Sequence, residues 1–197
     1  MKEKVILFDG TQESLQNFYA LQTGYDARWL VLEDGSLTVT CHDIVSKYEY
    51  GDAHVHVEFR IPHMPYVEGQ WKGNSGVYIQ GCYEIQVLDS FGHEPKHDEC
   101  GGIYNIAAPL TNASLPEGEW QTYDVIIKAA KLNDDGSIKE HALITVIHNG
   151  QVIHNNFKLL TNNGGGKYDH VVERGPLLLQ DHACPVSFRN IWVQPLD

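Results

Sequence analysis

Two stretches of the sequence combine residue types that could perform acid–base chemistry on a sugar. The first is Gly73–Ser90, in which a period-two pattern sorts apolar and polar side chains onto opposite faces of two strands. The polar face carries four side chains: Tyr78, Gln80, Glu84 and Gln86. Trp71 and Tyr104 lie nearby in sequence, and sugar sites combine aromatic rings with carboxylates and amides. A Glu and a Gln side by side are also common on a solvated strand face, so both interpretations stay open.

The second stretch is Gly175–Trp192, in which Gln180 and His182 point away from the apolar side chains that precede them. His182 stands where a strand ends and a turn begins, a position that often lies at the rim of a cleft. Its imidazole titrates near neutral pH, as a general acid or base requires. A lone histidine is also an ordinary surface residue. Asp181 has the opposite parity, and we expect it to accept hydrogen bonds from the backbone.

Metal binding is a weaker possibility. The loop that contains His93, Glu94, His97, Asp98 and Glu99 has suitable ligand types, but it matches no recognised metal motif. Solvated loops of this composition are common. A pair of histidines, His54 and His56, lies on one strand face and could chelate an ion, although an exposed sheet face is the simpler interpretation.

Composition excludes several classes of protein. The 197 residues carry a net charge of −12, which disfavours binding to nucleic acids or anionic membranes. No apolar stretch approaches the roughly 20 residues of a membrane span, and no phosphate-binding, dinucleotide-binding or serine-hydrolase motif occurs. The N-terminus has no secretory signal. We therefore expect a cytoplasmic protein if Met1 is the native start, and a periplasmic or secreted one if a leader was removed.

Short alternating strands dominate the pattern. The residue pairs Asp34-Gly35 and Asn149-Gly150 predict hairpin turns, and Val55–Ile61 predicts a half-buried strand. Only Thr11–Ala20 has helical spacing. The pattern favours one all-β domain over residues 1–197, a sandwich or barrel with one short N-terminal helix. Asn162–Gly166 is expected to be a flexible surface loop, and the four scattered cysteines are expected to be free and mostly buried thiols.

At these residues the sequence resembles the DUF1080, or 3-keto-disaccharide hydrolase, domain family. The matching segments run in order over nearly the whole chain: Leu7–Gly10, Tyr50–Ile61, Asn74–Ser90, Gly101–Pro109, Gly118–Ile127 and Gly175–Leu196. Three positions depart from the family pattern. Phe18 stands near an expected tryptophan, Gln80 replaces a common arginine that could contact substrate, and Ala183 replaces a usual glycine beside His182.

The resemblance implies a concanavalin A-like jelly roll, a sandwich of two antiparallel sheets with a site on the concave face. It also implies an enzyme that cleaves glycosides whose sugar is already oxidised to a ketone at C3. The ketone acidifies the C2 proton, so a modest base can remove it and the enolate can expel the anomeric substituent, with or without later hydration. Conventional glycosidases instead use two carboxylates about 5–9.5 Å apart.

For this reaction we expect Glu84 and His182 to form the acid–base pair, without assigning which of them is the base. The expected substrate contacts are Arg60, Tyr78, Gln86, Asp89, Tyr104 and Gln180. Arg60 could instead pair with Glu58, and Asp89 could serve the following loop. A divalent metal bound by Glu84 and His182 could replace Arg60 in stabilising the enolate. The partner is then a glycoside or oligosaccharide. A non-catalytic carbohydrate-binding module and a conventional endo-glycanase remain as alternatives.

Overall fold

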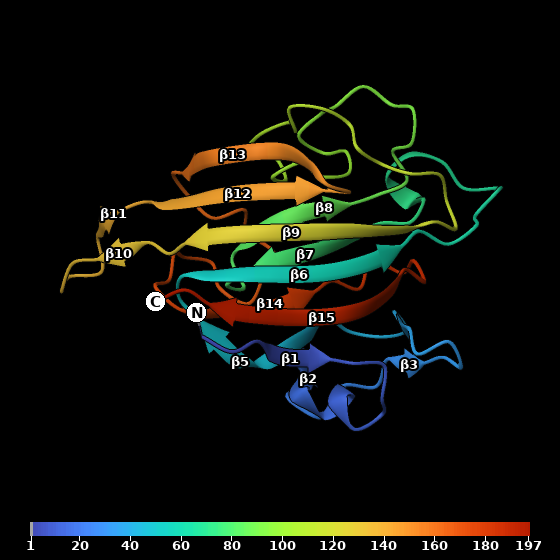
Figure 1. The fold of residues 1–197 in the computed structure, drawn as a ribbon, viewed down its shortest axis with the longest axis horizontal. Coiled ribbons are helices and arrows are strands. Elements are labelled where there is room, and N and C mark those ends of the chain that lie inside the picture. Colours follow the sequence, from blue (N-terminus) through green and yellow to red (C-terminus); the bar gives the residue numbers. More distant parts are fainter. Residues whose placement is uncertain (1) are drawn as a thin grey trace.

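The computed structural model describes residues 2–197 as a sandwich of two main antiparallel β-sheets. Met1, on which the expectation about a leader depends, lies outside these residues. Figure 1 looks onto the larger sheet, with the smaller sheet behind it. The expected all-β sandwich is therefore confirmed.

The larger sheet has eight strands, and its long central strands alternate buried and partly exposed side chains. The strands of the sheet follow one another in the order β13 (Gln151–Leu159), β12 (Ala142–His148), β9 (Trp120–Lys128), β6 (Ala53–Arg60), β15 (Ser187–Pro195), β4 (Leu37–Thr38) and β3 (Leu30–Val31), and β1 (Val5–Phe8) also pairs with β15. In β6, Val55, Val57 and Phe59 are fully buried, as their period-two spacing predicts.

The smaller sheet has five strands, and three adjacent strands at one side of it are buried on both faces. The order is β2 (Phe18–Ala20), β5 (Ile44–Tyr50), β14 (Gly175–Leu179), β7 (Ser75–Ile79) and β8 (Tyr83–Val87). A separate pair, β10 (Lys131–Leu132) and β11 (Ile138–Glu140), projects from one end of the molecule (Figure 1). Every residue of β7, β8 and β14 is buried, so something besides the sandwich core covers their outward face.

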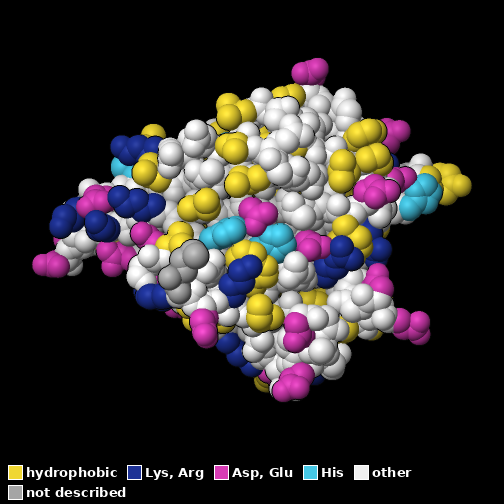
Figure 2. All heavy atoms as spheres, in the orientation of Figure 1, with side chains coloured by type: hydrophobic (Ala, Val, Ile, Leu, Met, Phe, Trp, Pro, Cys, Tyr) yellow, Lys and Arg dark blue, Asp and Glu magenta, His cyan; other side chains and the backbone are white. Residues whose placement is uncertain are grey.

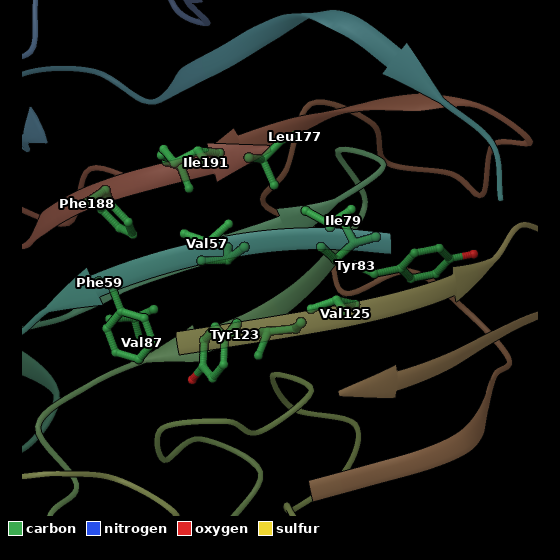
Figure 3. Close-up of a cluster of buried hydrophobic side chains, with 14 of the residues drawn as sticks. Val57, Phe59, Ile79, Tyr83, Val87, Tyr123, Val125, Leu177, Phe188 and Ile191 are labelled. Carbon is green, nitrogen blue, oxygen red and sulfur yellow. The ribbon is translucent and has the colours of Figure 1, made fainter. Parts of the chain in front are cut away.

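The core fills the space between the two sheets. Figure 3 shows side chains of β6, β9 and β15 facing those of β7, β8 and β14, among them Val57, Ile79 and Leu177. A second, small cluster of Val45, Tyr78 and Leu178 lies outside this core. Alternate residues of β7 therefore face in opposite directions: Val77 and Ile79 face the sandwich core, and Tyr78 faces away from it.

The predicted hairpin turns are present. Asn149 and Gly150 both have positive φ, which matches the twist of the flanking strands β12 and β13. Asp34 and Gly35 connect β3 to β4. The three-residue turn between β7 and β8 also contains two residues of positive φ, Gln80 at 53° and Gly81 at 68°.

The expected N-terminal helix over Thr11–Ala20 is wrong. Residues 2–197 contain no α-helix, and this segment forms a single 3-10 turn, η1 (Ser14–Asn17), followed by β2. Glu13 stands at the N-cap of that turn and makes no side-chain cap hydrogen bond, although the Thr11 hydroxyl accepts the N–H of Ser14. Phe18 and Ala20 then alternate into the core while their backbone pairs with β5, so strand pairing ends the helical path after one turn.

Two other expectations concern the cysteines and Phe18. The four cysteines are free, and Cys82, Cys100 and Cys184 are buried, as expected. Phe18, at the departure from the family pattern, is fully buried in the core.

The helical turns within residues 2–197 are too short and too polar to cross a membrane.

Candidate functional site

A pocket of about 270 Å³ opens on the outward face of the five-stranded sheet. Its lining residues come from β7, β8, the end of β14 and two loops: Asn74, Tyr78, Glu84, Gln86, Tyr104, Asn163, Gly164, Gly165, Gln180 and His182. The pocket therefore brings together the two stretches that the sequence singled out. Both expected acid–base residues, Glu84 and His182, line it.

The floor of the pocket is the β7–β8 hairpin. Its register pairs Tyr78 with Glu84 and Gly76 with Gln86, so these residues share one face. The Tyr78 hydroxyl donates a hydrogen bond of 2.8 Å to Glu84 Oε2. Gly76 makes room for the carboxylate, because a Cβ at this position would lie 2.4 Å from Glu84 Oε1. The glycine is therefore required for the observed position of Glu84.

Glu84 has the electrostatics of a group that exchanges protons near neutral pH. Its side chain is nearly inaccessible, with 4% of its surface exposed. This burial raises the pKa of Glu84 to about 7, while the hydrogen bond from Tyr78 works in the opposite direction and the charge of Asp43 adds to the rise. A buried, unpaired carboxyl with such a pKa in a pocket is typical of a catalytic acid or base.

One wall is the loop Asn162–Gly166, which we expected to be a flexible surface loop. Asn163 Oδ1 accepts the backbone N–H of Glu84 at 2.8 Å, and Asn163 Nδ2 donates to the carbonyl of Tyr104. Gly165 and Gly166 pass directly over the Tyr78 ring, where a Cβ on either would lie 3.2 Å or less from the nearest atom. The glycine run thus permits a close approach of the loop to β7 and completes the pocket.

The opposite wall is the segment that follows β14. Gln180 is held there because its carbonyl accepts the Ser75 hydroxyl at 2.7 Å, and its Nε2 reaches the Tyr78 hydroxyl at 3.3 Å. Asp181 Oδ1 accepts the N–H of Ala183, which confirms its expected structural role. Ala183 itself has φ 57°, a conformation that glycine adopts at lower cost.

A network of amides closes the pocket near η2 (Gly69–Trp71). Gln70 Oε1 accepts hydrogen bonds from Gln86 and Asn74, and Gln70 Nε2 donates to the carbonyl of Asp98. Gln86 Oε1 is buried and has no hydrogen-bond partner among the described residues. An unpaired buried acceptor costs free energy, so this oxygen stands out among the polar atoms of the pocket residues.

Three residues that were expected or suspected to contact the substrate lie outside the pocket: Arg60, Asp89 and Gln80. Arg60 lies on β6 of the other sheet, where it pairs with Asp34 at 3.3 Å and its guanidinium covers the ring of Trp120. Its alternative partner, Glu58, pairs with Arg189 instead. Asp89 pairs with Lys72 at 2.7 Å.

Gln80 also lies outside the pocket. It occupies the left-handed turn after β7, and its amide donates to backbone carbonyls that include those of Tyr50 and Gly51. The turn therefore ends the alternation on which the expectation for Gln80 was based.

The histidine pair His54 and His56 lies on the outward face of the larger sheet, on the far side of the sandwich from the pocket. Both rings bond to Asp124 Oδ1, at 2.8 and 2.9 Å. Figure 2 shows this face, with histidine and acidic side chains gathered over β6 and β9. Within residues 2–197, no group of three or more His, Cys, Asp or Glu side chains is arranged to hold a metal ion.

A second, more open hollow adjoins the pocket and shares His182 with it. It is lined by Thr40, Trp71, Asp181, His182 and Ala183, and its volume is about 450 Å³. The rings of Trp71 and His182 lie with their centres 6.0 Å apart. His182 therefore stands between two cavities.

Sequence reasoning missed Asn74, Asn163, Gly164 and Gly165 among the lining residues. The run of two asparagines and three glycines was visible, but its composition alone does not reveal which strands the loop covers.

The sequence matches the family described as the 3-keto-alpha-glucoside-1,2-lyase-like domain over residues 3–194. It is also similar to crystal structures of candidate glycosyl hydrolases from Parabacteroides distasonis ATCC 8503. One is 36% identical with a TM-score of 0.88, and the match covers 98% of this chain and 84% of that one. Another is 21% identical with a TM-score of 0.68, over 98% of this chain and 94% of that one.

More distant structures share the fold alone. The alginate lyase Aly36B is 10% identical with a TM-score of 0.54, and the match covers 100% of this chain and 98% of that one. No curated protein matches the sequence.

Proposed function

Because this chain belongs to the 3-keto-alpha-glucoside-1,2-lyase-like domain family, we propose that it cleaves glycosides whose sugar carries a ketone at C3. The reaction begins with removal of the C2 proton and ends with expulsion of the anomeric substituent. The observation that carries the proposal is Glu84, a buried carboxyl on the pocket floor with a pKa of about 7.

Glu84 is the base in this proposal. A C3 ketone lowers the pKa of the C2 proton, so a carboxylate with a raised pKa is strong enough to remove it. At neutral pH a group with a pKa of about 7 is divided between its two forms, so it can both take and release a proton. Tyr78 donates a hydrogen bond to the carboxylate and holds it in place.

His182 is the acid in this proposal, because it stands at the edge of the pocket rather than on its floor. The electron pair left at C2 forms a double bond between C1 and C2, while the pair of the breaking C1–O bond goes to the leaving oxygen. That oxygen takes a proton from the protonated imidazole. Water can then add across the new double bond to give a hydrated sugar.

The remaining lining residues orient the sugar. Gln86 Oε1 accepts a hydroxyl, since it has no partner among the described residues. The amide of Gln180, of which one N–H is used on the Tyr78 hydroxyl, supplies its other N–H to the C3 oxygen, where negative charge develops in the enolate. Arg60 has no part in this proposal because it lies on the other sheet.

Two alternative functions account less well for the site. A conventional glycosidase needs two carboxylates, and Glu84 is the only carboxylate among the described residues that line the pocket. A binding module has no need of a carboxyl buried with a raised pKa, because neutral amides bind hydroxyls without the cost of a buried charge.

The test compares a 3-keto-glucoside with its unoxidised parent glycoside, following release of the leaving group with and without a chelator. Release from the keto sugar alone supports the proposal, and the chelator arm shows whether a divalent ion takes part. Release from the parent would indicate a conventional glycosidase. Binding of either compound without release would indicate a binding module.

A further inference from the structure

The pocket around Glu84 is small. Its volume of about 270 Å³ lies below the roughly 300–1,000 Å³ of pockets that enclose drug-sized ligands. A single sugar ring is therefore the natural occupant. If the keto sugar fills this pocket, the group attached to its C1 has to leave through an opening and contact another surface.

The adjoining hollow lies where that group would emerge. His182 lines both cavities. A glycosidic bond that lies beside His182 therefore joins a sugar in the pocket to a leaving group in the hollow. Trp71 lines the hollow and is 68% exposed. An exposed indole beside such an opening presents a flat apolar surface of the kind that stacks on a sugar ring.

Trp71 is held in place by its surroundings. Its backbone carbonyl accepts the thiol of the buried Cys184 at 3.2 Å. The next residue, Lys72, pairs with Asp89 at 2.7 Å and with Glu117 at 3.2 Å. The preceding residue, Gln70, bonds to Asn74 and Gln86 of the pocket. The same short segment therefore positions both the pocket amides and the backbone of Trp71, so that less of the chain has to become ordered on binding.

The charges of the two cavities favour an uncharged leaving group. Among the described residues that line them there is no Lys or Arg. The one cationic group is the protonated imidazole of His182 in the proposed reaction, which gives its proton to the leaving oxygen, whereas Glu84 and Asp181 are acidic. A phosphate or carboxylate on the leaving group would be repelled. The hydroxyl of Thr40 and the carboxylate of Asp181 instead suit hydroxyl groups.

We propose that the hollow formed by Thr40, Trp71, Asp181, His182 and Ala183 is the leaving-group subsite, and that it holds a neutral second sugar ring stacked on Trp71. This inference rests on the proposed function. It places the contacts to the leaving group on named residues and gives Trp71 the role of a specificity-determining residue.

The test measures kcat and KM on two substrates that differ only in the leaving group: a methyl 3-keto-glucoside and a 3-keto-disaccharide that releases glucose. Trp71→Ala should raise KM for the disaccharide about fivefold, the size expected for loss of a stacked ring, and leave the methyl substrate unchanged. Trp71→Phe keeps a ring and should restore most of the difference. Tyr66→Ala is the matched control, because Tyr66 is a 98% exposed aromatic residue in the same loop between β6 and β7.

Equal effects of Trp71→Ala on both substrates, or no effect on either, would overturn the subsite while leaving the proposed function standing. A wild-type protein that cleaves neither keto substrate would refute the proposed function, and the subsite would fall with it. A selective loss that Tyr66→Ala reproduces would also overturn the assignment, because it would reflect the loop rather than the indole.

Discussion

Replacing Glu84 with Gln should abolish turnover and, at the same time, stabilise the fold at alkaline pH. Burial raises the pKa of Glu84 from 4.5 to about 7, and each pKa unit corresponds to about 1.4 kcal/mol. Above pH 7 the folded protein therefore carries an ionised carboxylate at a cost of roughly 3 kcal/mol relative to the unfolded chain. A glutamine has nearly the same shape and no charge to bury.

The sign of the pH dependence follows from the two pKa values. Between pH 4.5 and 7 the folded state binds more protons at Glu84 than the unfolded state does, so the stability of the wild type falls as pH rises through this window. Below pH 4.5 the carboxyl is neutral in both states and the penalty disappears. The advantage of Glu84→Gln should accordingly be about 3 kcal/mol at pH 8 and well under about 1 kcal/mol at pH 4.

Urea unfolding at pH 8 and pH 4, followed by tryptophan fluorescence, measures this difference directly. Glu58→Gln is the matched control. Burial works to raise the pKa of Glu58, but hydrogen bonds from Asn190 and Arg189 outweigh it and lower the pKa below its usual value. The same chemical replacement should therefore destabilise the protein at pH 8, with a loss that shrinks toward pH 4.

A Glu84→Gln variant that is no more stable than the wild type at pH 8 would refute the reasoning. It would mean that the carboxylate is well solvated or paired in the folded protein, and Glu84 would then lose its strongest qualification as the base. A gain that persists undiminished at pH 4 would refute it equally, because the gain would then have nothing to do with ionisation.

Three further predictions concern activity. Tyr78→Phe removes the donor to Glu84 Oε2, so the pKa of Glu84 should rise by about one unit or more. The acidic limb of the pH profile of kcat/KM should move to higher pH, and the activity should be regained at high pH. An acidic limb that does not move would contradict this role of Tyr78. His182→Asn should lower kcat/KM by about 10²–10⁴-fold while calorimetry shows unchanged binding of the unoxidised parent glycoside, and an equal loss of binding would make His182 a binding residue only. Gly76→Ala would place a Cβ 2.4 Å from Glu84 Oε1 and displace the carboxylate, so kcat/KM should fall about 10²-fold with an unchanged circular dichroism spectrum; full activity would show that the carboxylate position is not critical.

Much of the fold could be predicted from local patterns. Alternation in Val55–Ile61 depends only on the strand period, and Asn149-Gly150 predicts a turn because both residues tolerate positive φ. The helix predicted over Thr11–Ala20 was wrong because the same spacing also suits one helical turn followed by a strand. Pairing of Phe18 and Ala20 with β5 decided between these outcomes, and that partner is distant in sequence.

The candidate site could likewise be predicted only in part from the sequence. Alternation alone placed Tyr78, Glu84 and Gln86 on one face, since they belong to two strands joined by a short turn. It misplaced Gln80, because the left-handed turn conformation of that residue interrupts the period. It could place Arg60 on the polar face of its strand but could not tell which sheet that face belongs to.

The amino-acid sequence by itself thus determined the strands, their apolar faces and the hairpin that carries Glu84, because these depend on neighbours within a few residues. Only the tertiary structure decided that the Asn162–Gly166 loop covers Tyr78, that Gln180 and His182 line one pocket with Glu84, and that Trp71 stands beside His182. These contacts join segments as distant in sequence as those of Trp71 and His182. The pKa of Glu84 belongs with them, since it comes from burial by side chains that only folding brings together.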